Sequence, residues 1–474
     1  MRTVSSLVTS FATGLLVLAV AAPSWANGRF PYANQLVFAP RTPGLVVLRT
    51  TYGILPSRDD GATWGYVCEG ALGLSPNSDE DPSIALTAAD ALVTGHFLGL
   101  SVSPDIGCNW SCLGGALNAV PVVDLATRPD APQSVVALTS RYEESDSSAY
   151  NIDVRVFETT DGGITWAQLG GALPNDLNVA TIDVTATDPS RLYVSATRRT
   201  GSALTAWLYV STDRGSTWQG TSMGSAFDPT LENGVYIGGV DPTSAGRLYL
   251  RSTAAPSGGQ SRLTVVDVGP DGTPAFRGAH AFDVEADPTM GGMLGFALSQ
   301  DGATVYIGSQ RDGLWSASSS TLDFQKRSST PVGCLATRGN ELWACATESA
   351  GFIAGVSYDS GATFVPKLPS IAHLSGPAAC APTPQSACGA TENGSQCAAA
   401  WESFCMSMPC GGDAGQGTPP VTTPASPPRE PSGNRPSCAA GGAWATAVAT
   451  GERTAVVVCG AVLAAALRRR RRRS

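Results

Sequence analysis

The sequence has little charge, few aromatic residues and no clustered metal ligands. Charged residues make up 15% of the 474 residues and aromatic residues 7%, whereas glycine is abundant at 53. This mix suits many short strands joined by tight turns better than helices rich in Glu, Lys and Leu. No Cys-x-x-Cys pair is present, and His96, His280 and His373 are too scattered to complete a zinc site. We therefore expect no metal centre and no cofactor.

The first 26 residues have the features of a signal peptide. Arg2 supplies a positive start, residues 15–22 an apolar run, and Ser24 and Ala26 the small residues before a cleavage point at Asn27. If Arg2 and the six arginines at 468–473 are not part of the exported protein, removing these seven positive charges from the net charge of −9 leaves −16. An acidic body repels phosphate backbones, so we expect no nucleic-acid partner.

One eight-residue motif, of the form S-x-D-x-G-x-T-W, returns five times. Its copies begin at residues 57, 103, 159, 211 and 357, and the copy at 103 has Asn109 in place of Thr. The first four recur at intervals of 46, 56 and 52 residues, which indicates a repeat fold. The positions that define the copies are Asp59, Gly61 and Trp64; Asp105 and Trp110; Asp161, Gly163 and Trp166; Asp213, Gly215 and Trp218; and Asp359, Gly361 and Phe364.

Each position of the motif has a structural reason. The Asp carboxylate can accept hydrogen bonds from turn amides that lack a strand partner. The Gly permits a backbone conformation that is costly for other residues. The aromatic residue starts the next strand and packs between sheets. We expect the motif aspartates to hold turns near the outer strands and to have no catalytic role.

Short β-rich runs around the motif predict the fold class. Four antiparallel runs surround the copy at 211, which is the size of one propeller blade. The same pattern continues without the motif through residues 234–267 and 294–316. We predict an all-β fold, a single propeller of four-stranded blades starting near residues 36, 82, 120, 178, 234, 292 and 332. Seven blades are counted, six or eight stay open, and a two-sheet sandwich would not explain the repeat intervals.

The motif resembles the Asp box, or BNR repeat, of bacterial sialidases and related propellers. In those families the boxes lie away from the catalytic face, so the resemblance implies structural boxes here. It also raises a sialidase activity, which needs three arginines, a Tyr–Glu pair and an Asp. No matching motif is found: the nearest string is Arg29-Phe30-Pro31, and Arg49 and Arg251 lie on predicted strands. The enzyme question stays open, and we lean toward no activity.

Two acidic runs are candidates for glycosidase carboxylates or for loop calcium. Asp79-Glu80-Asp81 lies between the first two blades, and Glu143-Glu144-Ser145-Asp146 lies between strands of the third. Acidic loop residues are mostly solvated, and we expect that here.

The chain after the propeller divides into three parts. Residues 27–370 form the predicted propeller and 371–410 a Cys-rich, disulfide-tied appendage, because so short a piece cannot bury a core unaided. Residues 411–437 have the composition of an extended linker, and 438–474 end the chain.

The last part resembles the carboxy-terminal sorting tags of myxobacterial surface proteins. It has Cys438, an apolar run expected to be helical, and the block Arg468, Arg469, Arg470, Arg471, Arg472 and Arg473. The resemblance implies a sorting protease of the membrane as a partner, retention through the cysteine and removal of the arginines. Glu452 and Arg453 depart from the pattern, because they leave only 14 continuous apolar residues where about 20 would span a bilayer.

Twelve cysteines in an exported chain are expected to form disulfides. One pair can be assigned from hairpin arithmetic: a turn centred on Gly339 and Asn340 places Cys334 directly opposite Cys345. The pairing of Cys68, Cys108, Cys112 and the 380–410 cluster stays open.

Together these features predict an exported, cell-surface, monomeric propeller. The leading hypothesis is a non-catalytic protein that binds an extracellular glycan or protein, an inference from fold class rather than from a site. The alternative is a glycoside hydrolase of sialidase-like or xyloglucanase-like propeller type. The sequence does not identify the ligand.

Overall fold

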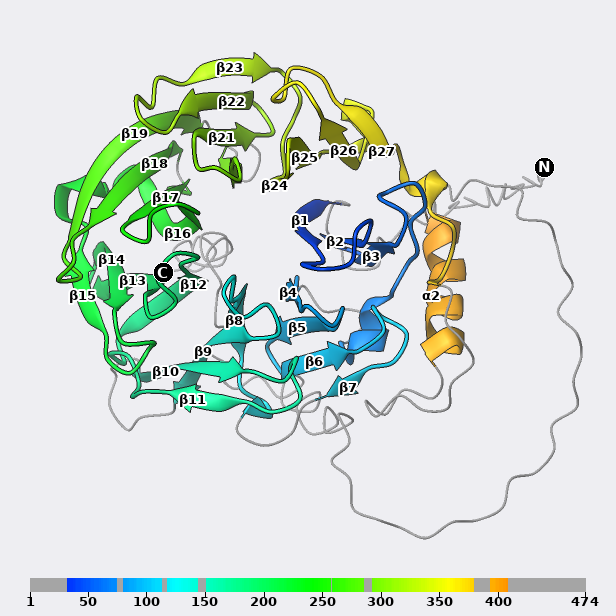
Figure 1. The fold of residues 1–474 in the computed structure, drawn as a ribbon, viewed down its shortest axis with the longest axis horizontal. Helices are drawn as coiled ribbons and strands as arrows, with labels where there is room; N and C mark the ends of the chain where they lie inside the picture. The colour runs from blue at the N-terminus through cyan, green and yellow to red at the C-terminus, as the bar shows by residue number, and fades with distance from the viewer. Residues whose placement is uncertain are drawn as a thin grey trace, which may run out of the picture.

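The protein is a seven-bladed β-propeller. A computed structural model describes residues 32–74, 80–112, 117–143, 151–256, 258–284, 292–378 and 393–407. Seven antiparallel sheets stand around a central axis, each built from consecutive strands (Figure 1). The blades start within a few residues of the positions predicted from the repeat. Six blades have four strands, as predicted, and blade 1 differs.

The strands run outward from the axis in chain order within each blade. Blade by blade they are β1 (Ala33–Phe38), β2 (Val46–Thr50) and β3 (Gly53–Ser57); β4 (Ser83–Leu86), β5 (Leu92–His96), β6 (Gly99–Ser103) and β7 (Ser111–Cys112); β8 (Val122–Thr127), β9 (Val135–Glu143), β10 (Asn151–Thr159) and β11 (Ala167–Leu169); β12 (Leu177–Val184), β13 (Leu192–Thr200), β14 (Ala203–Ser211) and β15 (Gln219–Ser222); β16 (Glu232–Val240), β17 (Arg247–Ala254), β18 (Gly259–Val268) and β19 (Pro274–Val284); β20 (Met293–Leu298), β21 (Thr304–Ser309), β22 (Gly313–Ser318) and β23 (Gln325–Ser328); and β24 (Cys334–Arg338), β25 (Glu341–Cys345), β26 (Ala354–Ser357) and β27 (Val365–Leu368).

The helices are few and short. The 3-10 turns are η1 (Glu69–Leu72), η3 (Gly224–Ala226), η4 (Glu348–Ala350) and η5 (Ile371–His373), and the α-helix α2 spans Asn393–Ser407. No helix within the described ranges is long and apolar enough to cross a membrane.

The core lies between adjacent sheets, because each blade is apolar on both faces. Val136, Leu138 and Val154 of blade 3 pack on Leu177 and other residues of blade 4 in one cluster. Alternate residues of the same strands, Ala137 and Phe157, pack on blade 2 in another cluster. This alternation follows from the two-residue period of a strand and explains why both faces read as apolar in the sequence.

Blade 1 is completed by chain from the other end of the protein. Its fourth strand is reduced to a single bridge between Ile54 and Val67. Outside that bridge, Tyr66 pairs in parallel with Pro377, its N–H donating to the Gly376 carbonyl at 2.9 Å. Residues 64–67 thus pair with residues 375–378, and blades 1 and 7 also pack directly on each other in one core cluster.

Helix α2 covers the same edge of blade 1 (Figure 1). The Phe404 ring stacks on Tyr52 and Tyr66, with ring centroids 5.2 and 5.4 Å apart. A disulfide joins Cys397 of the helix to Cys68, with Cα atoms 5.3 Å apart. The predicted Cys-rich appendage is thus tied to the propeller itself, and we call this assembly of residues 64–68, 375–378 and α2 the closing clasp.

Cys334 and Cys345 form the disulfide predicted from the hairpin register. They are paired across β24 and β25 with Cα atoms 4.8 Å apart. Arg338 faces Glu341 at the turn, as the two-residue loop required. Cys108, Cys112 and Cys405 are also disulfide-bonded.

Five turns between the third and fourth strands carry the repeated motif, and each turn has the same pattern of hydrogen bonds. In the copy at 159, Asp161 accepts bonds from the Thr165 N–H and hydroxyl at 2.9 and 2.6 Å and from the Thr159 hydroxyl at 2.8 Å. The Gly163 N–H donates to the Thr159 hydroxyl at 2.9 Å. Asn109 takes the place of the Thr by donating from its side-chain amide to Asp105. These aspartates therefore accept hydrogen bonds from their own turns.

The residue before the motif Gly also has a positive φ, which the sequence did not reveal. Asp60, Ile106, Arg214 and Ser360 have φ of 63, 60, 63 and 58°, and Gly162 takes this position in blade 3. The turn needs two consecutive left-handed residues, and only the second is fixed as Gly.

Substitution of a motif aspartate should destabilise the fold in a pH-dependent way. We expect Asp161→Ala to cost about 1 to 3 kcal/mol at pH 7, because it leaves turn amides without their acceptor. Desolvation alone would raise the pKa of Asp161, but the Thr165 hydroxyl and the backbone N–H donors outweigh it and lower the pKa to about 2. The carboxylate therefore stabilises the fold above about pH 4, and this contribution is lost as the pH falls toward 2.

Urea denaturation of wild type and Asp161→Ala at pH 7, 4 and 2.5 measures this. The difference in free energy of unfolding should shrink from pH 4 downward. Asp161→Asn is the control, since it keeps one acceptor oxygen and cannot titrate in this range. A difference that stays constant to pH 2.5 would contradict the assigned role.

The blades differ in height. The middle strands of blades 3 to 5 (β9, β10, β13, β14, β17 and β18) have 8 to 10 residues, whereas those of the other blades have 4 to 6. In blade 3, residues 140–143 of β9 continue beyond the last partner on β8, where Val122 pairs with Thr139. The ring face that carries the turns between second and third strands is therefore raised over one arc.

Candidate functional site

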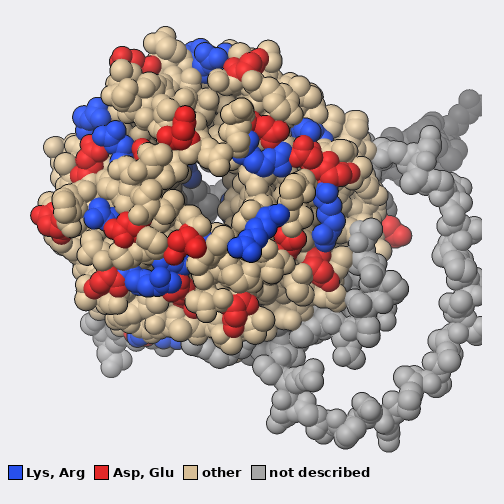
Figure 2. Space-filling model, in the orientation of Figure 1, with Lys and Arg blue, Asp and Glu red and all other residues tan. Residues whose placement is uncertain are grey.

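The axis of the ring is the first place to look for a site, since it is where all seven inner strands meet. Figure 2 shows the ring hollowed at its centre, with acidic and basic side chains interspersed over this face. Neither sign gathers into one large patch there.

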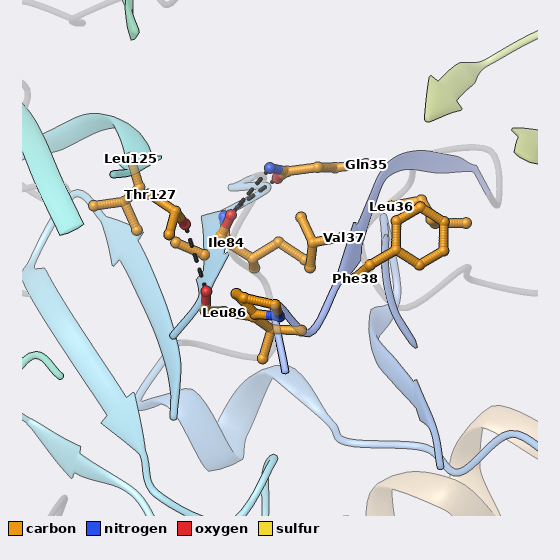
Figure 3. Close-up of a pocket in the computed structure, with 10 residues that line it drawn as sticks. Gln35, Leu36, Val37, Phe38, Ile84, Leu86, Leu125 and Thr127 are labelled. Atoms are coloured by element: carbon orange, nitrogen blue, oxygen red, sulfur yellow. Dashed lines mark hydrogen bonds between the residues drawn. The ribbon is translucent and has the colours of Figure 1, made fainter. Parts of the chain in front are cut away.

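A cavity of about 310 Å³ opens between the inner strands of blades 1, 2 and 3 (Figure 3). Its lining is mainly apolar, with Gln35 and Thr127 as polar members. Gln35 is already engaged, because its side-chain amide accepts from the Ile84 N–H at 3.2 Å and donates to the Ile84 carbonyl at 3.0 Å. The cavity can hold an apolar group, and no ionisable residue lines it.

Polar side chains of the inner strands tie several neighbouring blades together. The Ile182 N–H on β12 donates to the Asp124 carboxylate on β8 at 3.0 Å. The Ile237 N–H on β16 donates to the Thr181 hydroxyl on β12 at 2.7 Å. An inner strand has one edge without a strand partner, and these side chains satisfy amides on that edge.

Two carboxyl groups, neither singled out from the sequence, lie on neighbouring inner strands. Both Asp124 and Asp183 are half-buried. Desolvation by burial raises the pKa of Asp124 to about 7 and that of Asp183 to about 6, against the backbone donors that lower them. The negative charge of Asp183 raises the pKa of Asp124 further. A carboxyl that holds its proton near neutrality is what a general acid requires, so this pair is the only feature on the axis of the described chain that suggests chemistry.

Arg49 and Arg251, noted in the sequence as candidates, lie on β2 and β17, the second strands of blades 1 and 5. Arg49 donates to the Pro82 carbonyl at 3.1 Å and to the Asn34 amide oxygen at 2.7 Å. Arg251 donates to the Met293 carbonyl at 3.0 Å and stacks over Tyr236 at 5.0 Å. Each binds a backbone carbonyl of the following blade, so both act as further ties between blades.

The acidic runs do not form a site among the described residues. Asp79 and residues 144–150 lie outside the described ranges. Glu80 is buried and accepts a hydrogen bond from the Phe97 N–H, and Asp81 accepts from the Asn34 amide at 3.1 Å. Glu143 pairs with Arg141 at 3.3 Å. No group of three potential metal ligands occurs in the part of the chain that the structure describes.

The three histidines lie apart and none has the setting of a base. His280 is enclosed by Phe282, Trp315 and Phe324, with ring centroids 4.9 to 5.2 Å away. The Ser370 hydroxyl lies 2.8 Å from His373 Nδ1 at an exposed position.

A Ser–His contact that sequence spacing did not suggest occurs within blade 2. The His96 Nε2 lies 3.0 Å from the Ser101 hydroxyl, and both residues are buried. Ser101 donates its proton to the Leu72 carbonyl at 2.9 Å, so the histidine must be the donor in their contact. Burial also lowers the pKa of His96 to about 4. The pair is therefore structural and has no reach to a substrate.

Comparisons with known proteins concern the fold alone. No protein-family model and no curated protein matches the sequence. A GH74 xyloglucanase from Xanthomonas campestris is 16% identical, with 70% of this chain and 64% of that chain covered and a TM-score of 0.34. The chain thus spans less than two thirds of that enzyme.

Two further solved structures are similar at the same level. The β-propeller domain of Cps50 (Swd1) from Myceliophteria thermophila is 11% identical over 68% of this chain and 96% of that chain, with a TM-score of 0.43. Sqt1 from Saccharomyces cerevisiae is 14% identical over 71% and 86%, with a TM-score of 0.44. We infer no activity from these similarities.

Proposed function

We propose that the protein is an exported, non-catalytic propeller that binds an extracellular glycan or protein through its raised face. The observation that carries this is the engagement of polar side chains between blades. Asp124, Arg49 and Arg251 each bind backbone groups of the following blade. These side chains are already bonded within the ring, and a rigid ring with one tall arc offers a surface to a large ligand.

Export and surface display are part of the same proposal. Disulfides are stable in oxidising compartments, and the structure has them both within a blade and across the closing clasp. The signal-peptide features, the Asp-box resemblance and the sorting-tag resemblance of residues 438–474 support display at the cell surface; residues 1–31 and 408–474 lie outside the described ranges. Intact-mass analysis of surface-extracted protein tests the proposed removal of the C-terminal arginines. A mass that still includes residues 468–473 would contradict it.

A glycoside hydrolase is the second candidate, favoured by one observation. Asp124 and Asp183 are neighbouring carboxyl groups with raised pKa values, and glycoside hydrolysis uses a pair of carboxyl groups with one kept protonated. Leu125 lines the axial cavity, whereas the carboxyl group of the adjacent Asp124 faces blade 4, because consecutive strand residues point to opposite faces.

Asp124→Asn separates the two candidates. Under the binding proposal the Asp124 side chain only links blade 3 to blade 4. Its ionisation opposes folding, because the pKa of its carboxyl group is raised in the folded protein. Stability is then lost as the pH rises from about 4 through about 7. The variant should match the wild-type melting temperature at pH 4, exceed it at pH 8 and leave ligand binding unchanged.

Product analysis with a panel of neutral and sialylated oligosaccharides completes this test. We expect no cleavage by the wild type. Cleavage by the wild type that Asp124→Asn or Asp183→Asn abolishes, with the fold intact, would replace the binding proposal by the hydrolase.

A further inference from the structure

Two large apolar side chains are exposed at the tip of the blade 2 hairpin. Phe97 and Leu98 form the turn between β5 and β6 and are 43% and 54% exposed. Two-residue hairpin turns favour Asn, Gly and Asp, so the fold does not account for this choice. The turn is held firmly, because the buried Glu80 carboxylate accepts from the Phe97 N–H.

A charged wall stands beside this tip. Residues 140–143 and 151–154 form the overhanging end of the blade 3 hairpin. Arg141, Glu143 and Asp153 share a strand face with Ala137 and Phe157, which pack on blade 2. Blade 2 lies beside blade 3 in the ring (Figure 1), so this polar face looks over the shorter blade.

The chain between the two blades fixes the tip close to the wall. The Ala119 N–H donates to the Leu98 carbonyl at 3.1 Å, and the Ser140 N–H donates to the Pro121 carbonyl at 3.0 Å. Residues 119–121 therefore bridge Leu98 to Ser140, where β9 begins to extend beyond β8. Gly99 permits the approach, since a Cβ there would lie 2.5 Å from the Leu117 carbonyl oxygen. We call the resulting surface the step. Its apolar floor is formed by Phe97 and Leu98, and its polar wall by the overhanging end of the blade 3 hairpin.

The charged side chains of the wall pair with one another and with the adjoining Arg155. Arg141 pairs with Glu143 and Asp153, each at 3.3 Å, and Arg155 pairs with Asp153 at 2.8 Å. Arg141 and Glu143 are nevertheless 47% and 42% exposed. With Arg155 counted, the described residues here carry two positive and two negative groups, so they give no net attraction to a charged polymer. They do present donors and acceptors side by side, which suits the hydroxyl groups of a sugar, and an aromatic floor suits a sugar's apolar face.

We propose that this step between blades 2 and 3 binds a neutral oligosaccharide, with Phe97 as the stacking platform and Arg141 and Glu143 as hydrogen-bonding partners. The inference rests on the proposed binding function and names its ligand class and place. Charged polysaccharides and peptides are alternative outcomes of the test.

Calorimetric titration of the full chain with neutral gluco-, xylo- and manno-hexasaccharides tests the proposal. At least one should bind the wild type, and Phe97→Ala and Arg141→Ala should each weaken it roughly tenfold or more. Tyr358→Ala is the matched control, an aromatic that is 62% exposed on a turn at the opposite end of its blade. It should leave affinity unchanged, and all three variants should keep the wild-type melting temperature.

The outcomes separate this inference from the function on which it rests. Binding that Phe97→Ala and Arg141→Ala leave unchanged would overturn the step as the site while the binding function stands. Binding only to an anionic polysaccharide or a peptide, or to none of the hexasaccharides, would overturn the ligand class. Cleavage of a hexasaccharide by the wild type would overturn the non-catalytic function itself.

Discussion

Removal of the Cys68–Cys397 disulfide should lower the free energy of unfolding by about 2 to 5 kcal/mol. The bond links residues 329 apart in sequence, so its loss frees a very long loop in the unfolded chain. It also releases α2 from blade 1, where Phe404 stacks on Tyr52 and Tyr66. The paired variant Cys68→Ser with Cys397→Ser avoids an unpaired thiol, and denaturant unfolding measures the loss.

The hairpin disulfide provides the control for this experiment. Cys334 and Cys345 are 11 residues apart on adjacent strands that pair without the bond. In the loop-entropy relation, the variant Cys334→Ser with Cys345→Ser should cost less than the clasp variant, by up to about 3 kcal/mol. Equal losses in the two variants would show that the clasp contributes nothing through ring closure.

Arg128→Met should destabilise the protein by about 3 to 5 kcal/mol, because it breaks a buried ion pair. The Arg128 side chain is 0% exposed, and its Nε lies 3.3 Å from the Glu158 carboxylate and 3.4 Å from that of Asp130. The guanidinium also donates to the Pro189 carbonyl, which joins blade 3 to blade 4. The substitution leaves the buried Glu158 charge with Arg214 as its remaining cation.

Two comparisons test this explanation by chemical denaturation. Arg214→Ala removes the other cation near Glu158, but its side chain is 47% exposed, so the cost should be about 1 kcal/mol or less. Adding Glu158→Gln to Arg128→Met should recover much of the lost stability, since no charge is then left buried. A double variant as unstable as the sum of its parts would assign the loss to packing alone.

The ring and its blade boundaries were predictable because each blade repeats one local rule. Apolar runs of strand length, turn residues and a motif held by its own side chains are all local in sequence, and Asp161 needs only Thr159 and Thr165 to form its network. The Cys334–Cys345 bridge was predictable for the same reason, since register across a short hairpin follows from counting.

Contacts between distant parts of the chain could not be predicted in this way. Nothing near Cys68 identifies Cys397 as its partner, and nothing near Tyr66 identifies Pro377 as the residue with which it pairs. The axial pair Asp124 and Asp183 looks like any two strand residues, because their raised pKa values come from burial that the ring creates. The step formed by Phe97 and the blade 3 hairpin depends on the unequal heights of blades 2 and 3. Sequence patterns predict the strand lengths that set these heights only approximately.

The closing clasp also sets the order in which the molecule can mature. The edge of blade 1 is made early, yet its partner segment lies more than 300 residues later, so a growing chain carries an unfinished β-edge until its last blade has formed. Such a pairing has a high contact order and closes slowly. Cys334 and Cys345 can oxidise within their own hairpin, whereas the thiol of Cys68 must wait for Cys397. The Cys68–Cys397 bond therefore cannot form until the last blade has been synthesised.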